Sequence, residues 1–190
     1  MAVDIFLITD PQIEVERTAE LLKATLERVN AAALLVAAGE ADDYVYIERL
    51  KKLAPIAQAR DCAVLVDGRP SLVKSARADG VHMSGGVKAL REAVDTLKPD
   101  YIVGTGDIGS RHEAMVRGEL EIDYLMFGDR DDPETNGREM ADWWAETFEV
   151  PSVYFAGPAD AGTLGERRSE FIAFAQADWD KIDALLGEQA

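Results

Sequence analysis

The sequence predicts an α/β protein of the (β/α)8 TIM-barrel class with minimal loops, formed as a single domain over residues 1–190. Short apolar runs alternate with helical patterns along the whole chain, and this alternation is typical of parallel strands joined by right-handed crossovers. The chain contains eight such units, and eight are enough to close a barrel. With 190 residues, it is shorter than a typical barrel of roughly 250 residues, so its loops must be short.

Eight apolar runs are the expected strands, and most of them end next to Gly, Pro or Asp. They cover residues 3–9, 33–38, 62–66, 80–84, 101–104, 124–128, 152–156 and 171–175. The competing fold is an open doubly wound sheet, which a G-x-G-x-x-G motif after the first strand would support. Asp10-Pro11-Gln12 stands at that place instead, so the closed barrel is favoured.

Helical patterns follow the strands. The helix over 14–29 has apolar residues at spacings of three and four. Asp42 is the expected cap of a helix that runs to residue 60 with a kink near Pro55, and Ser110 is the cap of a later one. The helix capped by Ser110 covers residues 111–117, and the other expected helices begin at Ser71 and Asp178 or cover residues 87–97, 138–148 and 160–167.

Composition and charge exclude several classes of function. Apolar residues make up 47% of the chain and charged residues 29%, which is a globular composition. The 36 acidic and 20 basic residues give a net charge of −16, which opposes binding to nucleic acid or to an anionic membrane. No apolar run approaches the roughly 20 residues of a membrane helix. The N-terminus lacks a signal-peptide pattern, so we expect a cytoplasmic protein.

The candidate catalytic residues are His82, Asp67 and Asp107, because each follows or ends an expected strand and barrel chemistry lies at that end. His82 would move a proton or fix a substrate hydroxyl, or else be a core histidine. Asp67 would bind a cation or a hydroxyl, or else cap its turn. Asp107 follows Gly104-Thr105-Gly106, which lets backbone N–H groups approach a ligand or simply forms a tight turn.

Anion-binding candidates lie at the same rim. Arginines follow three of the expected strands, at Arg69, Arg111 and Arg130; together they favour an anion site, although each is individually typical of a solvated side chain. The other candidates for substrate or phosphate binding are Thr105, Thr135, Gly157 and Gln176. Asp67 and Asp129 are candidate Mg²⁺ ligands, the latter in an acidic run that is otherwise a solvated loop. The opposite strand ends carry mainly Cys62, Asp79, Tyr101 and Tyr124.

Six stretches follow the strands in an order shared with a known family. They read FLITD at 6–10, VLVD at 64–67, ADGVHM at 78–83, IVG at 102–104, DYLMFG at 123–128 and EFIAF at 170–174. In these stretches the chain resembles the thiamine-phosphate synthase family over nearly its whole length. The resemblance implies a TIM-barrel transferase of thiamine biosynthesis, which joins a pyrimidine methyl diphosphate to a thiazole phosphate. It also implies that Mg²⁺ and basic groups stabilise the departing pyrophosphate.

Several positions of the family pattern are substituted here. The family's Gln-x-Arg-x-Lys segment falls on Val36, Ala38 and Glu40, and its two metal-binding Asp fall near Gly68 and Val87. The Lys of its Pro-Thr-x-Thr-Lys segment falls on Asn136, and the first of its two glycines falls on Ala156. Losing one preorganised charge-stabilising group costs roughly 10²–10³ in rate. The substitutions therefore predict little activity unless the rim arginines and the acidic loop replace these groups. His82, Asp67, Thr135 and Gly157 survive.

Two alternatives to that reaction stay open. One is a non-catalytic paralogue that binds a ligand or a partner, which the lost cations and retained rim loops favour. The other is a barrel enzyme in which His82 and Asp67 or Asp107 act on a phosphorylated small molecule. The expected ligand is a small molecule, phosphorylated or heteroaromatic, and the expected cofactor is Mg²⁺. A homodimer is the expectation from the frequency of symmetric oligomers.

Overall fold

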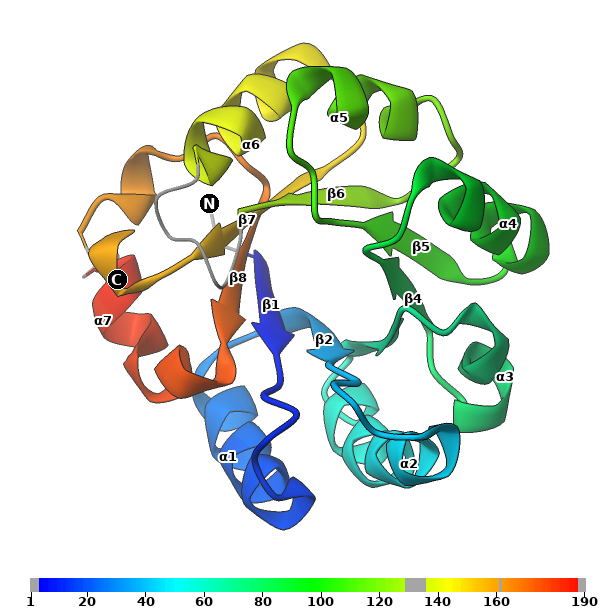
Figure 1. The fold of residues 1–190 in the computed structure, drawn as a ribbon. Coiled ribbons are helices and arrows are strands. Elements are labelled where there is room, and N and C mark those ends of the chain that lie inside the picture. The colour runs from blue at the N-terminus through cyan, green and yellow to red at the C-terminus, as the bar shows by residue number, and fades with distance from the viewer. Residues whose placement is uncertain (1–3, 129–135, 161, 188–190) are drawn as a thin grey trace.

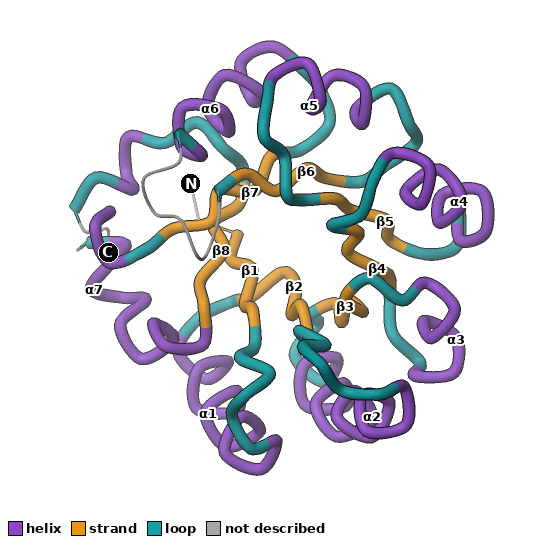
Figure 2. The backbone as a smooth tube through the Cα atoms, viewed as in Figure 1, coloured by secondary structure: helices purple, strands orange, loops and turns teal. Residues whose placement is uncertain are grey.

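Eight parallel strands close into a ring in the computed structural model, which describes residues 4–128, 136–160 and 162–187. Each strand pairs with its neighbours in chain order, and the last strand pairs with the first. Figure 1 and Figure 2 show the strands at the centre and the helices around them. The strands are β1 (Asp4–Ile8), β2 (Ala31–Val36), β3 (Ala63–Asp67), β4 (Gly80–Met83), β5 (Ile102–Thr105), β6 (Tyr124–Phe127), β7 (Ser152–Ala156) and β8 (Phe171–Ala175). The predicted TIM barrel is therefore confirmed.

The helices form the outer layer. They are α1 (Val15–Arg28), α2 (Asp43–Gln58), α3 (Val73–Ala76), α4 (Val87–Leu97), α5 (Arg111–Gly118), α6 (Gly137–Thr147) and α7 (Ile182–Leu186). Both predicted caps are confirmed: the side chains of Asp42 and Ser110 accept hydrogen bonds from backbone N–H groups in the first turns of α2 and α5. Each cap thus fixes where a helix begins after a loop at the rim of the barrel.

Within the described residues, short 3-10 turns replace helix at four places. They are η1 (Pro70–Leu72), η2 (Pro158–Asp160), η3 (Leu164–Glu166) and η4 (Gln176–Lys181). The expected helix over 160–167 was wrong, because Gly162 adopts a left-handed φ of +80° and interrupts the helical path. The helix expected from Asp178 begins instead as η4, and α7 follows it.

The apolar core has an inner and an outer part, because successive side chains of a strand point to opposite faces. The buried members of the inner cluster all lie on strands, as expected for side chains that fill the ring: Phe6, Ile8, Ala33, Leu35, Leu65, Tyr124, Met126, Val153 and Ala173. The outer cluster contains residues of strands and helices together, for example Leu7, Leu22, Leu50, Phe127 and Trp144. The inner cluster fills the ring, and its member Tyr124 also contacts His82.

Acidic side chains brace the amino ends of the strands. Three carboxylates each accept a hydrogen bond from the backbone N–H of a neighbouring strand, at 2.7–2.8 Å. The pairs are Asp79 with Val64, Asp123 with Val103 and Glu170 with Ser152. At this end of the barrel, polar groups therefore serve the fold. Within the described residues no helix combines the length and the apolar character that crossing a bilayer demands.

Candidate functional site

Four neighbouring strands place one row of residues across the inside of the ring. In the sheet register Asp67 of β3 pairs with His82 of β4, His82 pairs with Gly104 of β5, and Gly104 pairs with Tyr124 of β6. Gly104 has no side chain, and a Cβ there would lie 2.0 Å from the Tyr124 ring. The Tyr124 ring therefore occupies the space that another residue at 104 would fill.

This arrangement brings Tyr124 to His82. The Nδ1 atom of His82 and the Oη atom of Tyr124 lie 2.8 Å apart, and the two rings stack with 5.7 Å between their centroids. On the other edge of His82, Gly106 comes so close that a Cβ would lie 2.7 Å from Nε2. Glycine at 104 and 106 is thus required by the two rings that the strands place inside the barrel.

Burial controls the charge state of both rings. His82 is only 4% exposed, and its burial, followed by the positive charge of Arg117, lowers the pKa of His82 to about 4. The imidazole is therefore neutral near pH 7 and accepts or donates hydrogen bonds without carrying a charge. Burial also raises the pKa of Tyr124 well above its ordinary value, and the charges of Asp67 and Asp123 add to this effect.

Asp67 is held at the carboxyl end of β3 by groups from β2 and α2. Its Oδ2 atom accepts a hydrogen bond from the Ala38 backbone N–H at 3.0 Å. Its own backbone N–H donates to the hydroxyl of Tyr46, which in turn donates to the Val36 carbonyl. The carboxylate is half-buried next to His82 in the sheet register. The structure therefore brings two of the three predicted catalytic residues, Asp67 and His82, together.

Asp107 lies at the rim rather than in this row. It is exposed, has a left-handed φ of +56°, and directly follows Gly106, which lies against His82. The third predicted catalytic residue is therefore near the other two along the chain, with its side chain on the solvent side.

The predicted arginine cluster is engaged within the protein. Arg69 donates to the Asp43 carboxylate at 2.9 Å and to the Ala41 carbonyl at 2.6 Å, and its guanidinium lies 5.1 Å from the Tyr46 ring centroid. Arg111 pairs with Glu139 at 3.0 Å and also lies over the Trp143 ring. Binding a phosphate through either arginine would require exchanging these contacts for new ones.

Three further predicted ligand residues also have internal partners. The Thr105 hydroxyl donates to the Met83 carbonyl at 2.8 Å, and the Gln176 amide bonds with Thr18 and with the Asp10 backbone N–H. Both side chains are buried and tie strands to each other or to helices. The Gly157 N–H donates to Asp160 at 2.9 Å. The remaining predicted residues, Arg130, Thr135 and Asp129, lie outside the described residues.

Tyr124 is the functional candidate that the sequence analysis missed. It begins β6 at the amino end, opposite to the rim at which the candidate residues were expected. The signal available was the strand alternation, which puts Tyr124 and Met126 on the same inner face. Its reach to His82 depends on the gap at Gly104, and that gap becomes visible only when the strand register is known.

Magnesium has no preformed cage in the described part of the chain. Among those residues no group of three or more His, Cys, Asp or Glu side chains is placed to hold a metal ion. Asp67 contributes one carboxylate, and one of its oxygens already accepts the Ala38 N–H. These residues do not fit a resident metal. Mg²⁺ bound mainly by substrate phosphates needs only one or two protein carboxylates.

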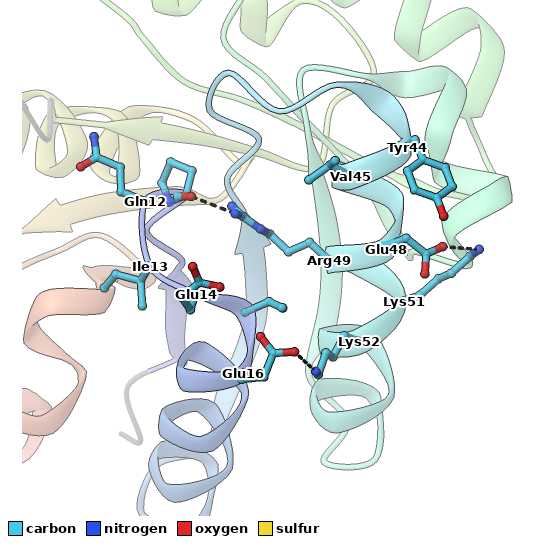
Figure 3. A pocket seen from close by; sticks show the side chains of 12 residues that line it. Gln12, Ile13, Glu14, Glu16, Tyr44, Val45, Glu48, Arg49, Lys51 and Lys52 are labelled. Carbon is cyan, nitrogen blue, oxygen red and sulfur yellow. Dashed lines mark hydrogen bonds and ion pairs between the residues drawn. The ribbon is translucent and has the colours of Figure 1, made fainter.

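A hollow lies between the starts of α1 and α2, outside the ring of strands. It is a groove of about 710 Å³, and Figure 3 shows the side chains that line it. Its cations already have partners: Lys52 pairs with Glu16, Lys51 with Glu48 at 3.0 Å, and Arg49 donates to the Pro11 carbonyl. The groove therefore lacks the unpaired charge that an anion site needs.

The fold and the row on β3 to β6 define a (β/α)8 barrel with polar groups at the carboxyl-end mouth, where barrels carry their ligand chemistry. The family model described as "Thiamine monophosphate synthase" matches residues 5–174. The chain belongs to this family.

Individual relatives agree with this assignment. The thiamine-phosphate synthase of Rhodospirillum centenum is 32% identical over 184 residues, which are 93% of this chain and 89% of that protein. The thiamine-phosphate synthase of Erythrobacter litoralis is 34% identical over 137 residues, 67% of this chain and 64% of that protein. The solved thiamine phosphate pyrophosphorylase from Pyrococcus furiosus has the same fold, with a TM-score of 0.79, 24% identity, and coverage of 97% of this chain and 92% of that one.

Proposed function

We propose that this chain is a transferase of thiamine biosynthesis, which joins a pyrimidine methyl diphosphate to a thiazole phosphate and releases pyrophosphate. The observation that carries this proposal is the row that starts at Asp67, on the carboxyl end of β3, and continues inside the ring through His82 to Tyr124, in a chain whose residues 5–174 match the family model. A Mg²⁺ ion bound to the diphosphate would need only one or two protein carboxylates, and Asp67 would supply one.

The residues of the row have separate roles in this proposal. His82 is neutral, and its 2.8 Å hydrogen bond with Tyr124 fixes the orientation of the ring beside Asp67. Asp67 supplies the negative charge beside it, for a ligand hydroxyl, an amine or the Mg²⁺ of the diphosphate. Asp107 faces solvent at the rim and meets the ligand as it enters.

The test is a condensation assay with both thiamine precursors and Mg²⁺. We expect turnover in the wild type and a loss of about 10²-fold in His82→Gln and Asp67→Asn, because each removes a positioned polar group. The control is Asp183→Asn, which changes an exposed ion pair with Arg28 remote from the mouth. Equal rates in the wild type and both site variants would contradict the assigned roles, and absence of turnover in the wild type would contradict the reaction.

A second candidate function is ligand binding without turnover. It is favoured by Arg69 and Arg111, whose guanidiniums are held by Asp43 and Glu139 rather than left for a departing pyrophosphate. The same samples distinguish it: thermal stabilisation by either precursor without product would support binding alone. If neither precursor stabilises the protein or is turned over, the remaining alternative is an enzyme in which His82 and Asp67 act on another phosphorylated small molecule. The homodimer and the cytoplasmic location stay predictions.

A further inference from the structure

Arg117 is a buried cation beneath the loop that joins β5 to α5. Its side chain is 3% exposed, and it lies in the last turn of a helix in which Ala114 is the other buried residue. The Nη1 atom donates to the Thr105 hydroxyl at 2.6 Å and to the Gly106 carbonyl at 3.2 Å. A guanidinium is buried at a cost unless it is fully paired, so these contacts call for an explanation.

Glu113, one turn earlier on α5, completes the pairing. One of its oxygens accepts hydrogen bonds from Arg117 Nε at 3.1 Å and Nη2 at 2.6 Å. The other oxygen accepts the backbone N–H of Gly109 at 3.1 Å. The pair therefore grips the loop at both ends, Arg117 at the Gly106 carbonyl and Glu113 at the Gly109 N–H. We call this arrangement the loop clamp.

The loop clamp controls two residues of the candidate site. Gly106 is gripped directly, and this is the residue that lies against the Nε2 edge of His82. Asp107 lies between the two gripped positions with its left-handed backbone. Thr105 links Arg117 to β4, because its hydroxyl accepts a hydrogen bond from Arg117 and donates one to the Met83 carbonyl at the end of β4. The hydrogen bonds of Arg117 and Thr105 thus connect α5 to the carboxyl ends of both β5 and β4.

We propose that Glu113 and Arg117 are positioning residues of the site: they hold the β5–α5 loop so that Gly106 packs on His82 and Asp107 stays at the rim. Neither acts on the ligand directly. The effect on turnover rests on the proposed function, whereas the effect on the loop and on His82 does not. A two-pronged guanidinium is required, because an ammonium is a point charge that cannot bridge the loop and the carboxylate in the same geometry.

The experiment compares Arg117→Lys, Arg117→Met and Glu113→Gln with the wild type by amide hydrogen exchange and by NMR of the His82 ring. We expect exchange at Gly106 and Gly109 to become at least about tenfold faster in the variants. The His82 ring signal should shift, while that of His112, on the outside of α5, should stay. Turnover should fall by about tenfold or more, mainly through kcat, because the reacting groups are misplaced. Lys88→Met is the matched control, since it breaks an exposed i,i+4 pair with Glu92 on α4.

Each result decides the proposal. Faster exchange at both glycines with a shifted His82 signal in the folded lysine variant supports the clamp. Unchanged exchange and an unchanged His82 signal in that variant would overturn it. If Arg117→Met does not fold, the lysine and Glu113→Gln variants carry the same comparison. An inactive wild type would refute the proposed reaction alone, because exchange and the His82 signal need no substrate.

Discussion

Gly104→Ala is expected to destabilise the barrel by about 3 kcal/mol or more, which is at or above the upper end of the usual cost of overpacking a core. The new Cβ would lie 2.0 Å from carbons of the Tyr124 ring, and that ring is buried against Phe6 and hydrogen-bonded to His82. The ring must move, and the His82 contact is lost with it. Urea unfolding followed by circular dichroism measures the change as a lower midpoint.

The control for this prediction is Gly157→Ala, where nothing lies within 4 Å of the added Cβ. Its stability should stay within about 0.5 kcal/mol of the wild type. In a double-mutant cycle, Tyr124→Ala should relieve much of the cost of alanine at 104, because the three atoms nearest to the added Cβ all belong to that ring. A wild-type unfolding midpoint in Gly104→Ala would mean that the Tyr124 ring does not fill the space between β4 and β6.

Stability should fall as the pH drops from 6.5 towards 4, through the range set by His82. Its pKa in the folded protein is lowered to about 4 from 6.5, first by burial and then by Arg117. The unfolded chain therefore binds a proton in this range that the folded protein refuses, and acid favours unfolding. The stability from this one group is fully present above pH 6.5, and about 2 kcal/mol of it is lost by pH 5.

The measurement is the free energy of unfolding at pH 7 and at pH 5 in the wild type and in His82→Gln. Carboxyls whose pKa is lowered in the folded protein, such as those of Glu16 and Glu113, titrate in both proteins and cancel in the comparison. The wild type should lose about 2 kcal/mol more than the variant. Equal losses in the two proteins would show that His82 is not buried as a neutral ring.

The sequence predicted both ends of a strand correctly where polar residues, Pro or Gly flank the apolar run. β7 follows Pro151, and its residues 152–156 were expected at both ends, as were 171–175 of β8. β2 lies two residues earlier than expected, because Ala31 and Ala32 carry little hydrophobic signal although they belong to the strand and Ala31 pairs with Ile5. A helix was wrongly predicted over 160–167, because the helical pattern there is weak and the glycines permit turns, which the structure shows as η2 and η3.

The site residues that could be predicted from the sequence are those that lie at the carboxyl end of their own strand. Asp67 and His82 meet that condition, and the closed ring brings them together. The alternation along β5 would have placed Thr105 outward, beside the buried Arg117. The partners of Arg69 and Arg111 come from Asp43 and Glu139, which lie 26 and 28 residues away in the chain. Such pairings follow from tertiary packing and leave no local pattern.

Amide chemical-shift mapping with the pyrimidine diphosphate and the thiazole phosphate, each in the presence of Mg²⁺, measures most directly whether ligands bind inside the barrel mouth. We expect the perturbed amides to cluster at the carboxyl ends of β3, β4 and β5, at Asp67, His82 and Gly106. Perturbation confined to the groove between α1 and α2, around Tyr44 and Arg49, would contradict binding at the mouth, and so would a spectrum that neither compound changes.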